Sequence, residues 1–409
     1  MKALVLAGGI PQAELIKQLK SRDIYTVLAD GSKNAVAVPF ADKFYEVDIF
    51  DIKKIKEIAE IEKVNFILTV CADQVLLVAA EVSEILGLPC YIDYETGKNV
   101  SDKIRMKKIF KSHEIPTSNY VETDSLDYEI ISKLNFPLIV KPVDSYSSKG
   151  VRKVNNIEEL KKYYHEASNI SRSGGVIVEE FIHGQEISVD AFVLDGKVQV
   201  LTISNSEKLK HKDKFIIFRG RYPAKIDEYI ESEIKKILQK IADAFQLTNS
   251  PLLVQLICDK NNNLFVLEFS ARTGGNMKWL LIKNSCGIDV IKATIDITLG
   301  LKPDISIDEL NDKIVVNDFI YCNEGVFDHL EGFEEMKNKG LINEYYAVRN
   351  KGTLMKEISS SSDRIAGINI IADSIDDFNK KQREILKSVK VIDSVGNDIM
   401  RRELLPDIK

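Results

Sequence analysis

The sequence is poor in the residues that mark several large classes of protein. It has five cysteines, none of them in a C-x-x-C pair, and five histidines without metal-ligand spacing. A zinc site or a disulfide framework is therefore not expected, and reduced thiols in a cytoplasmic protein are the simpler interpretation. No apolar run approaches the roughly 18 residues of a membrane-spanning helix, and the opening run is too brief for a signal peptide. We expect no membrane partner.

Excess positive charge is missing as well. The chain has 56 Lys and Arg against 62 Asp and Glu, a formal net charge of -6. Binding to nucleic acid needs clustered positive charge, so no nucleic-acid partner is expected. What the chain does have is length, with 409 residues of which 44% are hydrophobic and 29% charged. This composition is typical of a globular protein, and the length predicts more than one domain.

The first hundred residues alternate between strand and helix patterns. Short apolar runs predict strands over residues 3–7, 24–28 and 64–70, and amphipathic segments predict helices over 12–20, 51–60 and 73–86, the last capped by Asp73. Such alternation is typical of a doubly wound α/β layer. Gly8-Gly9 resembles a dinucleotide-binding turn, but the third glycine is missing and Pro11 follows. We expect a Rossmann-like turn that holds no dinucleotide.

Two further units follow in the chain. Strands are predicted over residues 138–140, 175–181, 186–194, 197–203, 252–258 and 264–269, with helices over 102–111, 157–167 and about 230–245. Ser101 is expected to cap the first of these helices, and Asp195-Gly196 predicts a two-residue hairpin turn. The pattern restarts after Pro303, with strands over 314–320 and 365–371 and a helix over 375–389.

Five short motifs that suit phosphate and metal chemistry follow one another between residues 101 and 275. Two lysines are what a polyphosphate requires, and a loop of small residues lets backbone N–H groups approach an anion closely. The five are Ser101-Asp102-Lys103 at a helix start, Lys141-Pro142 at a strand end, the loop Ser147-Ser148-Lys149-Gly150, then Glu179-Glu180-Phe181-Ile182 with Glu186 four residues on, and Glu268-Phe269-Ser270-Ala271-Arg272-Thr273-Gly274-Gly275 on a strand expected to pair with that of Gln255.

In this order and rough spacing, the motifs resemble the ATP-grasp superfamily over most of residues 1–300, although each motif alone is common. The resemblance implies an α/β protein with an N-terminal Rossmann-like domain over residues 1–98, an ATP-grasp core over 99–302 and a C-terminal lid-like α+β domain over 303–409. It also implies ATP and Mg²⁺ as cofactors, with Mn²⁺ as an alternative metal.

The resemblance assigns a role to each motif. Lys103 and Lys141 would hold the α- and β-phosphates, and Ser147, Ser148, Lys149 and Gly150 would close over the β- and γ-phosphates. The adenine would lie along Glu179, Glu180, Phe181 and Ile182, and Glu186 would accept hydrogen bonds from the ribose. Plain core packing stays open as an alternative for Phe181 and Ile182.

The implied metal site departs from the family pattern. Magnesium takes hard oxygen ligands, and the pattern has a carboxylate on one hairpin strand and Glu-x-Asn on the other. Glu268 fits, whereas Gln255 and Ser270 are neutral oxygen donors. One formal charge in place of two should weaken metal binding before ATP arrives, or remove one of two ions.

Arg272 is the expected catalytic residue, together with Lys141. Alternate strand residues point the same way, so Arg272 should share a face with Glu268 and Ser270. Its guanidinium suits the transferred phosphoryl group, and a salt bridge to Glu268 is the alternative. Further substrate contacts are predicted for Lys208, Arg221, Gly274, Gly275 and Arg364, with a solvated loop equally open for the first two.

The order of domains resembles the L-amino-acid ligase and carbamoyl-phosphate-synthetase-like branch. This implies a ligase in which a small carboxylate attacks the γ-phosphate, giving ADP and an acyl phosphate, and a small amine then displaces phosphate to form an amide. A homodimer is a candidate assembly. Alternatives are a carboxylase of the biotin-carboxylase or purine-biosynthetic type, a kinase that stops at a phosphorylated product, and a nucleotide-binding regulatory protein without ligase chemistry.

Overall fold

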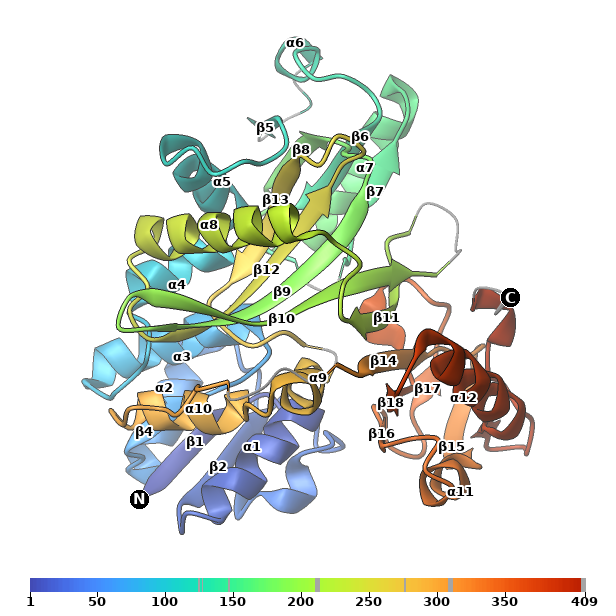
Figure 1. Cartoon of the computed structure of the whole chain (residues 1–409). Helices are drawn as coiled ribbons and strands as arrows, with labels where there is room; N and C mark the ends of the chain where they lie inside the picture. Colours follow the sequence, from blue (N-terminus) through green and yellow to red (C-terminus); the bar gives the residue numbers. More distant parts are fainter. Residues whose placement is uncertain are drawn as a thin grey trace.

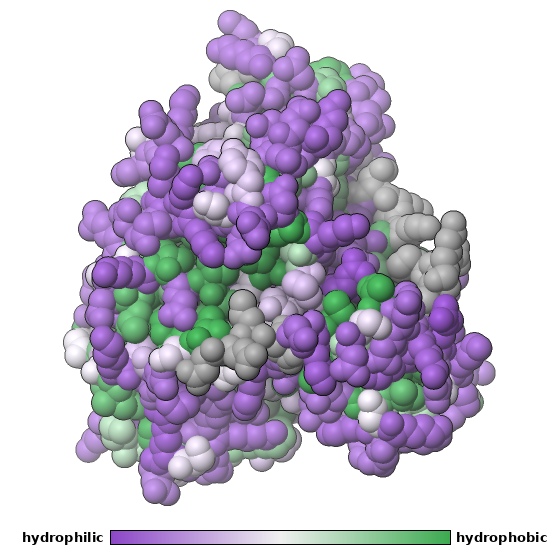
Figure 2. All heavy atoms as spheres, viewed as in Figure 1, coloured by the Kyte–Doolittle hydropathy of each residue, from purple (hydrophilic) through white to green (hydrophobic). Residues whose placement is uncertain are grey.

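The computed structural model describes residues 1–405 apart from 124–125, 127, 146–147, 210–213, 276 and 308–311. In Figure 1 the chain runs from a blue α/β layer through a large green and yellow sheet to an orange and red C-terminal part beside it. Hydrophilic residues cover most of the face seen in Figure 2, and hydrophobic ones gather across its middle. Within the described part of the chain, no helix is long and apolar enough to cross a membrane.

The N-terminal layer is a parallel sheet with helices on both faces, as the alternating pattern predicts. Strands β1 (Lys2–Leu6), β2 (Tyr25–Asp30), β3 (Lys43–Glu46) and β4 (Phe66–Leu68) pair in the order β3-β2-β1-β4. Helix α1 (Ile10–Lys20) connects β1 to β2, α2 (Ile52–Glu62) connects β3 to β4, and α3 (Asp73–Leu86) follows β4. Val5 and Leu28 enter one hydrophobic cluster while Leu4 and Val27 enter another, because a parallel strand is buried on both faces.

A small antiparallel sheet stands at the top of Figure 1. Its strands are β5 (Tyr120–Thr123), β6 (Leu138–Pro142), β7 (Arg152–Val154) and β8 (Val176–Glu180), in the order β5-β8-β6-β7. Helix α7 (Ile157–Ile170) packs Leu160 and Tyr164 against Leu138 and Val178, and the short helix α6 (Tyr128–Ile131) precedes β6.

The large sheet has eight strands in the order β13-β12-β9-β10-β11-β14-β18-β16. They are β9 (Gln185–Leu194), β10 (Lys197–Lys208), β11 (Ile217–Tyr222), β12 (Ser250–Cys258), β13 (Leu264–Ser270), β14 (Ile314–Ile320), β16 (Glu344–Ala347) and β18 (Ala366–Ala372). Asp195 and Gly196 both have positive φ, 52° and 75°, as a two-residue hairpin turn requires. Because β11 pairs directly with β14, one sheet continues across residue 303, and the domain boundary placed there stays a prediction.

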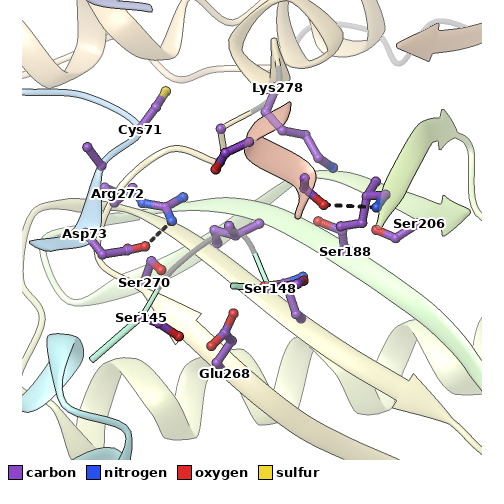
Figure 3. Close-up of a pocket in the computed structure, with 18 of the residues that line it drawn as sticks. Cys71, Asp73, Ser145, Ser148, Ser188, Ser206, Glu268, Ser270, Arg272 and Lys278 are labelled. Atoms are coloured by element: carbon purple, nitrogen blue, oxygen red, sulfur yellow. Dashed lines mark hydrogen bonds and ion pairs between the residues drawn. The ribbon is translucent and has the colours of Figure 1, made fainter. Parts of the chain in front are cut away.

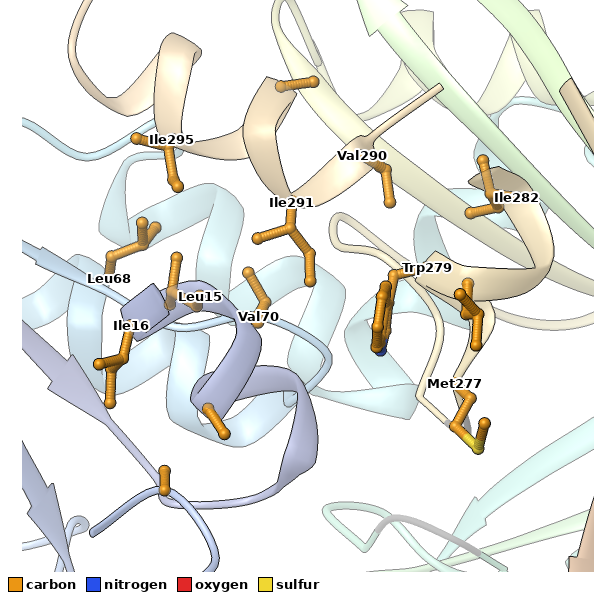
Figure 4. Packing of buried hydrophobic residues seen from close by; sticks show 14 of the residues in the cluster. Leu15, Ile16, Leu68, Val70, Met277, Trp279, Ile282, Val290, Ile291 and Ile295 are labelled. Atoms are coloured by element: carbon orange, nitrogen blue, oxygen red, sulfur yellow. The ribbon is translucent and has the colours of Figure 1, made fainter. Parts of the chain in front are cut away.

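Helices cover both faces of this sheet. Helix α8 (Glu228–Ala244) packs Ile234 and Leu238 against one face. Helices α9 (Lys278–Cys286) and α10 (Val290–Thr298) lie between the other face and the N-terminal layer (Figure 1). Figure 4 shows Ile291 of α10 facing Leu15 of α1 in the cluster that joins the two parts.

The C-terminal part adds a second, three-stranded sheet in the order β17-β15-β19. The strands of this sheet are β15 (Gly325–Glu331), β17 (Leu354–Met355) and β19 (Lys390–Asp393), and the helices of the C-terminal part are α11 (Phe333–Asn338) and α12 (Ile375–Ser388). Short 3-10 turns span Ser361–Asp363 and Arg402–Leu404 in this part and Val38–Phe40 in the N-terminal layer. Apolar residues such as Phe333, Ile368 and Phe378 form its core.

Two predicted helix caps were wrong. Ser101 ends helix α4 (Tyr94–Ser101), and Asp102 caps α5 (Lys103–Ser112) by accepting hydrogen bonds from the N–H groups of Ile104 and Arg105. The residue at the N-cap of α3 is Ala72, and Asp73 lies in the first turn. In both cases the neighbouring residue takes the extended conformation that a cap position needs.

A buried ion pair joins β11 to β14, the two strands through which the large sheet continues across residue 303. Arg219 Nη2 lies 2.8 Å from Asp318 Oδ2, and the two residues are each 5% exposed. Replacing Arg219 with Met should destabilise the protein by about 3–5 kcal/mol, because Asp318 would be left buried without its partner. The midpoint of urea unfolding, followed by circular dichroism, measures the loss.

Arg221→Met is the matched control on the same strand. Arg221 pairs with Glu207 at 2.9 Å, but its side chain is 30% exposed, so its loss should cost less than about 1 kcal/mol. Equal shifts for the two variants would contradict a structural role for the buried pair.

Candidate active site

A cavity of about 890 Å³ lies where all parts of the chain meet. Its walls include Gly8 and Asp73 from the N-terminal layer, Lys141 from the small sheet, Glu268 from the large sheet and Arg364 from the C-terminal part. The structure brings together most of the residues that the sequence predicts for binding ATP, metal and substrate. These are Lys103, Lys141, Ser148, Glu179, Glu180, Phe181, Ile182, Glu186, Lys208, Gln255, Glu268, Ser270, Arg272, Gly274, Gly275 and Arg364.

Three of the described residues that the sequence singles out lie elsewhere. Lys149 is exposed and Gly150 is buried against Pro142, with a φ of 76°, so neither lines the cavity. Arg221 is held by Glu207 instead. Ser147 lies outside the described residues.

Lys103 lies between a loop and the hairpin strand. As the first residue of α5 it places its ammonium group near the cavity wall, where Nζ donates to the carbonyl of Ser145 at 2.7 Å and lies 3.7 Å from Oε2 of Glu268. The cation is therefore close to both the small-residue loop and the one acidic residue of the predicted metal set.

Glu179 is enclosed between two lysines. Its Oε2 lies 2.9 Å from Nζ of Lys107 and accepts from Ser118, while its Oε1 pairs with Lys141. Burial alone would raise the pKa of Glu179, but the two ammonium groups hold it well below its usual range. Glu179 is 3% exposed and Lys107 1%, so the cluster keeps three charges out of water.

The predicted metal-binding residues lie on paired strands. Gln255 of β12 stands directly opposite Glu268 of β13, so their side chains share a face. Glu268 is 40% exposed at its side chain, whereas Ser270 is buried and hydrogen-bonds to Asp73. Within the described ranges, no group of three or more His, Cys, Asp or Glu residues could hold a metal. Any metal here would rest on Glu268 and neutral oxygens.

Arg272 has a partner that the sequence did not suggest. Strand β13 ends at Ser270, so the alternation of side chains stops before Arg272, and its guanidinium pairs with Asp73 rather than with Glu268 (Figure 3). Burial favours the neutral form of Asp73, but the charge of Arg272 lowers its pKa overall. An acidic residue just after a parallel strand was the only signal for Asp73.

One end of the cavity is aromatic. The rings of Phe181 and Phe215 lie 6.2 Å apart, and Lys153 Nζ lies 4.1 Å from the centre of the Phe181 ring. Glu186, predicted for ribose, forms an ion pair with Lys208, predicted for substrate. These two predictions therefore concern one end of the cavity.

The C-terminal part supplies two arginines to the cavity wall. Arg364 is buried, its Nε donates to the carbonyl of Ser361, and its guanidinium lies 4.4 Å from the Phe319 ring centre. Arg349 donates to the carbonyl of Ser362. The hydrogen bonds of both arginines go to backbone carbonyls, and neither forms an ion pair with a carboxylate among the residues that the structure describes. Sequence reasoning missed Arg349, which no motif marks.

Residues 134–279 match the family model described as "ATP-grasp domain". The chain carries an ATP-grasp domain. A D-alanine--D-alanine ligase of Prochlorococcus marinus (strain AS9601) is 29% identical over 224 residues, which cover 49% of this chain and 61% of that protein. A phosphoribosylamine--glycine ligase of Methanosphaera stadtmanae is 25% identical over an alignment of 448 residues, which covers 99% of this chain and 97% of that protein.

Solved structures share the fold. A crystal structure of L-amino acid ligase from Bacillus licheniformis superposes with a TM-score of 0.81 at 19% identity, over 96% of this chain and 98% of that one. A phosphoribosylglycinamide synthetase from Anaerococcus prevotii gives a TM-score of 0.75 at 21% identity, over 96% and 99%. The α/β ATP-grasp fold predicted from the sequence is confirmed. The ATP-grasp domain match itself includes Lys141, Glu268 and Arg272, while Lys103, Asp73 and Arg364 lie outside it.

The thiol of Cys71 gives a test of the electrostatics at the cavity wall. Burial raises the pKa of the Cys71 thiol to about 12, so very little of it is thiolate at pH 8. Iodoacetamide should therefore alkylate Cys71 of the folded protein far more slowly than after unfolding in guanidinium chloride at the same pH, as followed by peptide mass spectrometry. Rapid alkylation in the folded protein would contradict this environment.

Proposed function

We propose that the protein is an ATP-dependent carboxylate–amine ligase, which forms an amide through an acyl phosphate and releases ADP and phosphate. One observation carries this proposal. A single cavity joins cations suited to a polyphosphate, Lys103 and Lys141, with Arg272 and with two C-terminal arginines that have no carboxylate partner among the described residues.

The aromatic end of the cavity supports ATP as the nucleotide. Phe181 and Ile182 offer apolar surface for a base. Glu186 forms an ion pair with Lys208 and could also accept hydrogen bonds from the ribose hydroxyls. The same cavity is lined by Lys103, Lys141, Glu268 and Arg272, and Lys103 lies 3.7 Å from Glu268. A nucleotide with its base at the aromatic end would place its phosphates among these residues.

Magnesium, with manganese as an alternative, would be held by Glu268 with the Gln255 oxygen and the phosphates themselves. The donors are hard oxygens, which suit these ions, and the half-exposed Glu268 carboxylate is available on the cavity side. Ser270 is a poorer candidate because its hydroxyl engages Asp73. A bound ion would neutralise charge on the phosphate oxygens.

Arg272 would stabilise the transferred phosphoryl group. A substrate carboxylate oxygen attacks the γ-phosphorus, the bond to the β-phosphate oxygen breaks, and ADP leaves. The amine nitrogen then attacks the acyl carbon, and phosphate departs as the amide forms. Positioning and charge neutralisation supply the catalysis, and the fixed guanidinium of Arg272 contributes to both.

The two C-terminal arginines support an anionic substrate group. Burial and the nearby charge of Arg349 lower the pKa of Arg364 against the opposing effects of Tyr321 and Asp363, so a substrate carboxylate beside the two arginines would relieve the repulsion. Arg pairs carboxylates in a bidentate manner. We therefore place the carboxylate-bearing substrates on this side of the cavity, next to Gly274 and Gly275, and leave the assembly as a candidate homodimer.

A release screen tests the proposal. ADP and phosphate should appear when the protein, MgATP and pools of amino acids or sugar acids are combined, with the mass of an amide product. Glu268→Ala removes the carboxylate that would hold magnesium, and Arg272→Ala removes the guanidinium beside the transferred group, so each should lower kcat by roughly 100-fold or more. Lys302→Ala, at an exposed pair with Asp195, is the control and should leave turnover unchanged.

Other outcomes favour the alternatives. Phosphate release with bicarbonate and no amine would indicate a carboxylase, and ADP without free phosphate would indicate a kinase. Tight ATP binding without turnover under any pool would indicate a regulatory protein.

A further inference from the structure

Helix α5 carries a second lysine directly behind Lys103. Lys107 follows Lys103 by one turn, so the two side chains share a face of the helix. Lys103 lines the cavity, whereas Lys107 is 1% exposed and is not among the residues that line it. A role for Lys107 must therefore act through another residue.

All three ammonium hydrogens of Lys107 have a partner. Nζ lies 2.9 Å from Glu179 Oε2, 3.1 Å from Ser118 Oγ and 2.5 Å from Thr117 Oγ1. Ser118 also donates to the same carboxylate oxygen at 2.5 Å. Glu179 Oε2 is thus held by one cation and one hydroxyl, independently of Lys141 on Oε1.

This arrangement decides whether Lys141 is free to bind phosphate. Glu179 is 3% exposed, and a buried carboxylate without a counter-charge is strongly disfavoured. If Lys141 were the only cation beside Glu179, the movement of Lys141 to a nucleotide phosphate would leave that carboxylate buried without a counter-charge. With Lys107 present, one ion pair remains when Lys141 leaves.

The net charge of the cluster formed by Lys107, Lys141 and Glu179 also indicates that Lys107 favours phosphate binding. Two lysines and one glutamate carry a net charge of +1, which attracts a polyphosphate, whereas one lysine and one glutamate carry none. Burial lowers the pKa of Lys107, and the neighbouring Glu179 carboxylate opposes this shift.

We propose that Lys107 is a positioning residue for phosphate binding: it holds the buried Glu179 carboxylate so that Lys141 can leave Glu179 and contact the nucleotide phosphates. This inference rests on the proposed function, since it assumes that the cavity binds ATP through Lys141.

The test compares ATP with adenosine, which lacks phosphates. Dissociation constants of MgATP and of adenosine are measured by calorimetry for the full chain and for Lys107→Met. Because only phosphate binding depends on Lys141, Lys107→Met should weaken MgATP binding at least tenfold and change adenosine binding by less than about twofold. Lys108→Met is the matched control, since Lys108 is exposed on the same helix and pairs with Glu122.

A double variant separates positioning from structural damage. In Lys107→Met with Glu179→Gln, the competing carboxylate is gone, so Lys141 is free and MgATP affinity should return to within a few-fold of the original protein. Equal weakening of MgATP and adenosine, unchanged MgATP affinity in Lys107→Met, or no recovery in the double variant would each overturn the inference.

A milder variant covers the case in which Lys107→Met does not fold. Ser118→Ala removes one of the two groups on Glu179 Oε2 and should weaken MgATP binding by about two- to tenfold with adenosine unchanged; no change would count against the inference. If the original protein binds adenosine but gains nothing from phosphates, or binds neither ligand, the proposed function fails instead.

Discussion

Charge buried around the cavity is the constraint on which the rest of the structure depends. Glu179 is buried, and Lys107 and Lys141 hold its pKa well below its usual range against the effect of burial, while Arg272 lowers the pKa of Asp73. Each pair unites residues far apart in the chain. A buried charge without its partner is costly, so folding favours the arrangement in which the helices and strands that carry these residues meet.

The fold supplies the rigid frame for these pairs. The large sheet runs without a break from β13 to β16, and α10 packs Ile291 against α1 so that the N-terminal layer is fixed to its face. Asp73 at the start of α3 therefore reaches Arg272 across this junction. The cavity takes its walls from different parts of the chain, with Lys141 and Phe181 near the small sheet and Arg349 and Arg364 in the C-terminal part, which suits the proposed reaction of a nucleotide with two further substrates.

Local patterns in the sequence predicted most of the fold but only some residues of the candidate site. Apolar periodicity predicted strands such as β9 and β12 and helices such as α8 because each pattern lies within one element. Asp73, Lys107 and Arg349 could not be found in this way, since each matters through a partner or a cavity formed by distant segments. Arg272 shows the same limit: the alternation rule holds only as far as Ser270, where β13 ends. The adjacent residues Ser101 and Asp102 both suit a cap, and only the start of α5 decides between them.

The most direct test of the account follows one oxygen atom. In the proposed reaction the attacking carboxylate oxygen bonds to the γ-phosphorus and leaves with phosphate when the amine forms the amide. With a pool of amino acids labelled with ¹⁸O in their carboxylates, we expect the phosphate released with ADP to carry one ¹⁸O atom, as read by mass spectrometry. Amide product accompanied by unlabelled phosphate would contradict an acyl phosphate and, with it, the central claim.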